Sequence, residues 1–181
     1  MGTNEAITDG ATFRRVVTGH DQRGRSICLL DDRTRESVGW IHNLWLTSAG
    51  PADNSGIADP LRRGGAIPLA PAPGGSLFRF FRVPSRSYVQ SLTEEQIEAT
   101  FALLDAGVAR QRGAGHRLMH ATQTLDYIVV LQGRVILHLD DGDVHLSPLD
   151  TVIQRGTSHG WTNESDEWAT LAIAMIGAQQ L

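Results

Sequence analysis

The feature that most constrains this chain is a series of short, β-branched segments that fills its C-terminal third. Glycine, proline and an Asp-Gly pair separate them, at Gly133, Asp141-Gly142, Pro148 and Gly156. Short strands separated by turns at this spacing favour an antiparallel sandwich or barrel of the jelly-roll kind. The predicted fold class is therefore all-β. The expected strands are 119–124, 127–131, 135–139, 144–146, 151–154 and 168–176.

The N-terminal half adds a few more strands of the same type. Segments 13–18 and 26–30 predict a hairpin around a polar turn, and 40–47 and 76–83 predict two further strands. Between the last two lies a loop, 48–75, with five prolines. A loop of this length in a compact domain often covers a site or a subunit contact.

These N-terminal strands are too few to bury a core of their own. We therefore expect residues 1–181 to form a single domain, in which 1–115 supplies strands, loop and helix, and 116–178 supplies the barrel core. The strands of the first part are expected to extend a barrel sheet or to pair with a second subunit.

One segment, 93–112, has the pattern of a helix packed on the outside of the sheets. Thr93 and Gln96 have the spacing of a capping box, in which each side chain satisfies the other's free backbone N–H. Apolar residues recur at helical spacing from Ile97 to Val108, and Gly113 follows as a C-cap.

Composition excludes several classes of partner. The chain has a net charge of −4 and no long basic run, which is a poor match to nucleic acid. No apolar stretch reaches the roughly 18–20 residues that span a bilayer, and the first residues lack an apolar signal core. The single cysteine, Cys28, favours a reducing compartment and is expected to be a buried, inert thiol. We expect a cytoplasmic protein with no nucleic-acid or membrane partner.

Polar residues occupy every second position from His120 to Asp126, with Thr122 and Thr124 between them. Side chains alternate across a strand, so these four share one face if the segment is extended. That face lines a cavity inside the barrel or, alternatively, faces solvent.

Two spaced motifs follow. Asp126 is followed by six residues and Gly133, and Gly156 begins a Gly-x2-His-x3-Asn pattern through His159 and Asn163. Together they resemble the two motifs of the cupin superfamily, which implies a jelly-roll β-barrel, a small-molecule substrate and a homodimer. By this resemblance His120 and His159 match metal-binding histidines, and Asp126 stands in place of a glutamate.

The sequence also departs from the cupin pattern. Thr122 stands where a second histidine belongs, Leu149 replaces the first glycine of the second motif, and Gln154 replaces its proline. The resemblance leaves His120, Asp126 and His159 as ligands for a divalent ion, most simply zinc or iron, with nickel or manganese as alternatives. The competing interpretation is a metal-free pocket in which Asp126 and His120 act as base and acid.

Further residues near the motifs are candidates for the site. Tyr127 is a candidate proton donor, with core packing as its alternative. His138 and His145 lie outside the motifs and are expected at the surface. The candidate substrate-binding residues are His116, Thr122, Thr124, Gln154, Arg155 and Trp161. The alternatives are the cavity mouth or the surface for His116, the surface for Arg155 and core packing for Trp161.

These features support three functional hypotheses. The first is a metal-dependent lyase, in which proton transfer drives dehydration, decarboxylation or isomerisation of a small organic molecule. The second is an Fe(II)-dependent dioxygenase with the same ligands. The third is a non-catalytic small-molecule-binding protein that keeps the cavity without turnover.

Overall fold

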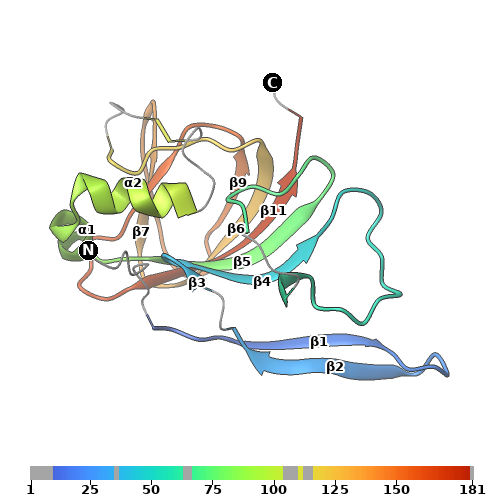
Figure 1. Ribbon diagram of the computed structural model, residues 1–181. Helices are drawn as coiled ribbons and strands as arrows, with labels where there is room; N and C mark the ends of the chain where they lie inside the picture. Colours follow the sequence, from blue (N-terminus) through green and yellow to red (C-terminus); the bar gives the residue numbers. More distant parts are fainter. Residues whose placement is uncertain (1–9, 35–36, 63–66, 104–109, 112–115, 180–181) are drawn as a thin grey trace, which may run out of the picture.

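The computed structural model describes residues 10–34, 37–62, 67–103, 110–111 and 116–179. The chain folds mainly into strands, with two short α-helices between the fifth and sixth strands (Figure 1). The strands are β1 Arg14–His20, β2 Ser26–Arg33, β3 Ser37–Val38, β4 Ile41–Thr47, β5 Ser76–Val83, β6 Thr124–Gln132, β7 Val135–Leu139, β8 Gly142–Leu146, β9 Thr151–Arg155, β10 Gly160–Thr162 and β11 Ala169–Gly177. The helices are η1 Pro60–Arg62, α1 Arg86–Ser91 and α2 Glu94–Leu103.

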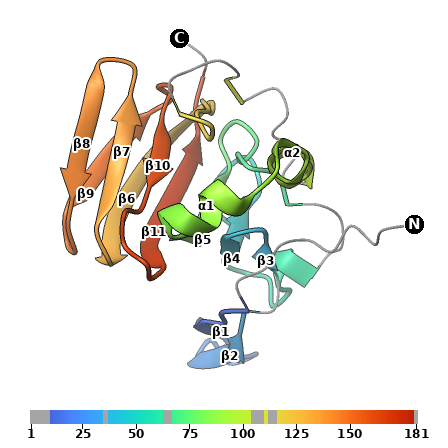
Figure 2. The same cartoon turned by 90° about the vertical axis from the view of Figure 1, so that its left-hand side faces the viewer.

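Two antiparallel sheets face each other (Figure 2). The larger has the strand order β3-β4-β5-β11-β6-β9 and the smaller the order β10-β7-β8. From β6 to β11 the chain crosses between the sheets repeatedly, which is a jelly-roll path. Within the described residues no continuous ladder joins the two sheets, so the predicted barrel is an open, two-sheet jelly roll.

The main core lies between the sheets. Its buried side chains come from both inner faces, among them Val130 and Leu171 of the larger sheet and Leu137 and Trp161 of the smaller one. Apolar residues alternate with outward-facing ones along β5, β6 and β11, as expected for sheets that bury one face. The predicted all-β fold class is confirmed.

The predicted N-terminal hairpin is confirmed as β1 and β2, which form a two-stranded sheet of their own beside the larger sheet (Figure 1). Arg15 pairs with Asp32 inside the hairpin at 2.8 Å, and it anchors the hairpin to the body through an ion pair with Asp59 at 2.7 Å. Cys28 lies on this hairpin and is exposed, so the expectation of a buried thiol is wrong. An outward position on a two-stranded ribbon has no second layer to cover it.

Helix α2 confirms the start of the predicted helix but not its length. The capping box is formed: the Gln96 N–H donates to Thr93 Oγ1 and the Thr93 N–H donates to Gln96 Oε1. The predicted end at residue 112 is wrong, because Arg110 pairs with His120 in an antiparallel bridge instead. Residues 104–109, on the predicted apolar face, and Gly113 lie outside the described residues.

A second apolar cluster fixes α2 against one end of the larger sheet. Ile97 and Phe101 of the helix pack with Trp40, Ile41 and Leu118. Helix α1, which the sequence pattern did not predict, lies next to it along the chain and contributes Tyr88 to the edge of the same cluster. These contacts place one face of α2 over the space between the sheets.

The predicted strand 119–124 is wrong. Among the described residues, His120 pairs only through isolated bridges to Arg110 and His159, and the regular strand begins at Thr124. The extended run therefore changes direction between His120 and Thr124, and β6 continues through the predicted strand 127–131 to Gln132.

None of the described helices is both long and apolar enough to cross a bilayer.

Candidate functional site

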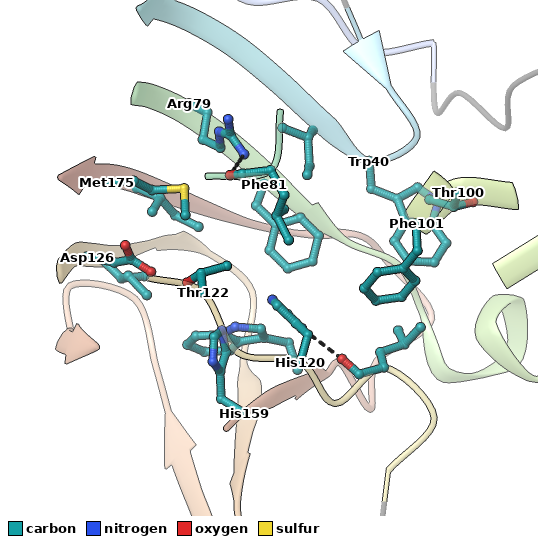
Figure 3. A pocket seen from close by; sticks show the side chains of 16 residues that line it. Trp40, Arg79, Phe81, Thr100, Phe101, His120, Thr122, Asp126, His159 and Met175 are labelled. Atoms are coloured by element: carbon teal, nitrogen blue, oxygen red, sulfur yellow. Dashed lines mark hydrogen bonds between the residues drawn. The ribbon is translucent and has the colours of Figure 1, made fainter. Parts of the chain in front are cut away.

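A cavity opens between the sheets at the end that α2 covers (Figure 3). About 90 Å³ of it is open to the centres of water-sized molecules, several times the roughly 10–15 Å³ that one water requires. Four aromatic side chains line it: Trp40, Phe81, Phe101 and Trp161. Six aliphatic residues add to the wall: Ile41, Leu69, Leu118, Ile128, Ile173 and Met175. The remaining lining residues are polar: Arg79, Thr100, His120, Thr122, Asp126 and His159.

The polar and aromatic groups are not evenly mixed. Figure 3 shows Arg79 and Asp126 toward one side of the cavity, next to Met175, and Trp40 and Phe101 toward the other. The cavity thus has a charged end and an aromatic end. Leu69 comes from the long loop 48–75, so this loop contributes to the wall as the sequence suggested.

His120 and His159 form a fixed pair. Each main-chain N–H donates to the carbonyl oxygen of the other residue at 2.9 Å, and the ring centroids lie 4.4 Å apart. Nδ1–H of His120 donates to the Leu118 carbonyl and Nδ1–H of His159 to the Thr157 carbonyl, each at 2.9 Å. Because a carbonyl only accepts, both Nδ1 atoms carry the proton, which leaves both Nε2 atoms with a lone pair.

Burial keeps both rings neutral. Burial, together with the neighbouring His120, lowers the pKa of His159 to about 3, against the hydrogen bond to the Thr157 carbonyl. Burial also lowers the pKa of His120, against the hydrogen bond to the Leu118 carbonyl. At neutral pH the pair therefore offers hydrogen-bond acceptors to a ligand.

Asp126 supplies the carboxylate of the cavity. It lies on β6, is 3% exposed, and its Oδ1 has no hydrogen-bond partner among the described residues. Burial raises its pKa to about 6, while hydrogen bonding with Thr124 and the charge of Arg79 act in the opposite direction. A carboxyl group with this pKa exchanges its proton near neutral pH.

Arg79 is the cation of the cavity, and the sequence analysis did not single it out. It lies on β5, is 2% exposed, and donates from its two terminal nitrogens to the carbonyls of Leu69 and Pro68. Burial lowers its pKa to about 10, so it remains charged at neutral pH. Arg79 shares the period-two spacing of the apolar residues Leu77, Phe81 and Val83, and this pattern indicates that its side chain lies on the inner face of the sheet.

The predicted metal ligands do not form a complete site. His120 and His159 are adjacent and Asp126 faces the same cavity, but the described residues contain no group of three histidine, cysteine or acidic side chains close enough to hold an ion. Three protein ligands are the usual minimum for catalytic zinc. The donor set therefore does not fit the metal site that the cupin resemblance implies.

The other predicted site residues divide between the cavity wall and positions elsewhere. Trp161 and Thr122 line the cavity, and Trp161 meets His159 edge-on at 6.3 Å. Thr124 is buried behind them and shares a 2.7 Å hydroxyl hydrogen bond with Thr122. Gln154 is buried and donates to the Thr157 carbonyl at 3.2 Å, outside the lining.

Three predicted residues lie away from the cavity. Tyr127 alternates with Asp126 on β6 and is exposed on the outer face, and Arg155 is exposed on β9. These positions do not match the proton-donor and substrate-binding roles considered for them. His116 stacks on His138 with ring centroids 4.6 Å apart, also outside the lining.

The His116–His138 stack belongs to a chain of hydrogen bonds on the smaller sheet. His138 bonds to Asp143 at 2.7 Å and to Thr162 at 2.6 Å, and Thr162 bonds to His116 at 2.9 Å. His138 is therefore partly buried, against the surface position expected for it, whereas His145 is exposed as expected.

No family model matches the chain. Two curated proteins of the fungus Diaporthe leptostromiformis, phomopsin biosynthesis cluster proteins C′ and D, are each 27% identical over 98% of this chain and 85% of their own length.

Solved structures similar to the chain include cupin domains. A cupin domain from Bordetella pertussis is 18% identical, with 65% of this chain and 98% of that chain covered and a TM-score of 0.37. A putative ethanolamine utilization protein Q from Salmonella typhimurium is 8% identical, with 94% and 100% covered and a TM-score of 0.41. The cupin domain of a Schizosaccharomyces pombe protein is 8% identical, with 91% and 87% covered and a TM-score of 0.43.

The structure itself shows two facing sheets, a jelly-roll path from β6 to β11 and a cavity between the sheets. The chain has a two-sheet jelly-roll fold.

Proposed function

We propose that the protein is an enzyme that binds a small, mostly apolar organic molecule between its sheets and moves a proton on it. The reaction is of the lyase or isomerase type, and Asp126 is the catalytic residue that takes up and returns the proton. The observation that carries this proposal is the buried Asp126 carboxyl, with a pKa raised to about 6 and one oxygen that has no partner among the described residues.

Asp126 has the two properties that a general acid–base group requires. Its pKa lies near the working pH, so both the acid and the base are present at useful concentrations. It also faces a cavity large enough for a ligand, so a bound molecule can come within hydrogen-bond distance. Most of the wall is apolar, which keeps water from competing for the transferred proton.

The imidazole pair has a positioning role in this proposal. Two neutral rings with lone pairs on Nε2 accept hydrogen bonds from a substrate N–H or O–H group. Their Nδ1–H bonds to main-chain carbonyls fix the orientation of the rings. Because both pKa values are lowered, neither ring is a strong proton donor at neutral pH.

The metal-dependent lyase and the Fe(II) dioxygenase both require an ion that the described donor set does not hold with three ligands. The proposed proton transfer therefore uses only the groups of this chain. Asp126 is the base in this scheme, and the buried Arg79 stabilises its ionised form through their mutual attraction.

The test is solvent deuterium incorporation. Small aromatic and aliphatic ketones and hydroxyketones, whose hydrogens next to the carbonyl are acidic, are incubated with the protein in D₂O, and exchange at carbon is followed by proton NMR. We expect the wild type to exchange at least one of them, and Asp126→Asn to slow that exchange by about 10²–10⁴-fold. The matched control is Asp141→Asn, which makes the same change at an exposed turn between β7 and β8.

Exchange that is equal in the wild type and in Asp126→Asn would contradict the role of Asp126. Saturable binding of these molecules without any exchange would instead support the non-catalytic binding protein, which the mostly apolar wall favours.

A further inference from the structure

Among the described residues that line the cavity, three have a buried polar atom without a hydrogen-bond partner: Trp40 on the aromatic side, and the two charged residues Asp126 and Arg79. Asp126 Oδ1, an acceptor, and Arg79 Nε, a donor, make no hydrogen bond within the described part of the chain. Both residues are at least nine-tenths buried. Since the great majority of buried polar atoms are satisfied, a ligand group is the natural partner for both.

The two side chains approach from either side of one strand. Arg79 on β5 is the register partner of Ile173 on β11, and Asp126 on β6 is the partner of Met175 on the same strand. Strands β5 and β6 flank β11, so their axes are roughly 10 Å apart. A group that lies over β11 therefore has Arg79 on one side and Asp126 on the other, as Figure 3 shows around Met175.

The charges of the cavity favour a neutral ligand group. Arg79 contributes one positive charge and the ionised Asp126 one negative charge, and each stabilises the charged form of the other. The imidazoles of His120 and His159 are neutral, and Thr100 and Thr122 carry no charge. Asp126 would repel a carboxylate that Arg79 attracts, and Arg79 would repel an ammonium group that Asp126 attracts, so neither charged ligand gains the attraction of one residue without the repulsion of the other.

One common group satisfies both atoms without adding charge. A hydroxyl has two acceptor lone pairs and one donor hydrogen. It accepts from Nε–H of Arg79 and donates to Oδ1 of Asp126. The rest of such a ligand then extends toward the other side of the cavity, where Trp40 and Phe101 offer aromatic surface.

We propose that the substrate of this site is a neutral alcohol or phenol with an apolar, preferably aromatic, body, and that Arg79 and Asp126 together bind its hydroxyl group. This inference rests on the proposed function and names its substrate class. It makes Arg79 a specificity-determining residue and places the hydroxyl next to the carboxyl group that transfers the proton.

Four probes with one body and different head groups test this: benzyl alcohol, toluene, benzoate and benzylamine. Their dissociation constants are measured at pH 7.5 by calorimetry or by ligand-observed NMR. We expect benzyl alcohol to bind at least about tenfold more tightly than toluene, because a hydrogen bond to a charged partner contributes that much affinity. Both charged probes are expected to bind more weakly than the alcohol. Equal affinity for alcohol and toluene, tighter binding of either charged probe, or no binding of any probe up to its solubility limit would overturn the proposal.

Variants assign the preference to the two residues. The readout is the ratio of the toluene to the benzyl alcohol dissociation constant, which does not depend on the fraction of folded protein. Arg79→Met and Asp126→Leu are each expected to reduce this ratio by about tenfold, to near unity. The matched controls Arg134→Met and Asp141→Leu, at exposed turns, are expected to leave it unchanged. A ratio that survives in both cavity variants would overturn the assignment.

Binding and turnover separate this inference from the proposed function. Alcohol-selective binding without deuterium exchange leaves the inference standing and contradicts the enzyme. Exchange of molecules that lack a hydroxyl, with no preference for alcohols, supports the enzyme and contradicts the inference.

Discussion

His120 and His159 face each other across a two-way main-chain bridge of 2.9 Å hydrogen bonds, with their rings 4.4 Å apart and both Nδ1 protons donated to carbonyls. The bridge connects the segment before β6 to the segment before β10, so it fixes one wall of the cavity. The first prediction concerns the protonation of this pair.

Both rings are expected to be neutral Nδ1–H tautomers at pH 7. Long-range ¹H–¹⁵N NMR spectra of the imidazoles distinguish the protonated from the unprotonated nitrogen, and a titration should show His159 charging only near pH 3. The exposed His145 provides the comparison. An Nε2–H tautomer, or a His159 that titrates near its ordinary value, would contradict this geometry.

The raised pKa of Asp126 predicts a pH-dependent stability difference. The folded pKa of about 6 lies above the ordinary 3.8, so the folded state binds more protons than the unfolded state between these values. The contribution of Asp126 is thus favourable below about pH 4 and is lost as pH rises through 6.

Asp126→Asn removes this dependence. We compare the free energy of unfolding of the variant with that of the wild type. The variant-minus-wild-type difference is expected to be more positive at pH 7.5 than at pH 4 by up to about 3 kcal/mol, because a shift of one pKa unit corresponds to about 1.4 kcal/mol. Urea denaturation of both proteins at the two pH values measures the difference. A constant difference would show that Asp126 has the same pKa in the folded and unfolded states.

The hydrogen-bond chain through Thr162 predicts a structural role for His116. Thr162→Val removes the hydroxyl that bonds to both His116 and His138, and should destabilise the protein by about 1–3 kcal/mol. Benzyl alcohol affinity should not change, since neither histidine lines the cavity. Weaker ligand binding at full folding would place His116 in the substrate site after all.

Removal of divalent ions by a chelator tests whether the protein depends on a bound metal. After dialysis against EDTA, deuterium exchange and benzyl alcohol binding are expected to match those of untreated protein, because two imidazoles without a third nearby ligand bind divalent ions weakly. Activity that is lost on dialysis and restored by zinc or Fe(II), but not in a His120→Ala, His159→Ala double variant, would contradict this expectation.

Parts of the site were accessible from the sequence because they depend on local spacing. The alternation from His120 to Asp126 predicted one shared face that lines a cavity or faces solvent, and Thr122 and Asp126 lie in the cavity wall. The cupin resemblance predicted that His120 and His159 belong to one site. The same alternation in β5 places Arg79 among Leu77, Phe81 and Val83, so its burial was also readable from the pattern.

Other features depend on contacts between distant segments. The pairing of Arg110 with His120 prevents the helix from continuing to residue 112, and no local sequence pattern indicates this pairing. The distance of Asp126 from the imidazole pair depends on how the chain turns between His120 and Thr124, so ligand spacing in the sequence did not guarantee a metal site.

The pH dependence of deuterium exchange tests the central claim most directly. With Asp126 as the base, the rate of exchange into a bound ketone or hydroxyketone should rise with pH, reach half its maximum near pH 6 and level off above it. In Asp126→Asn the rate should be about 10²–10⁴-fold lower, without this inflection, while Asp141→Asn follows the wild type. A wild-type profile without an inflection near pH 6, or one that persists in Asp126→Asn, would contradict the assignment of proton transfer to Asp126.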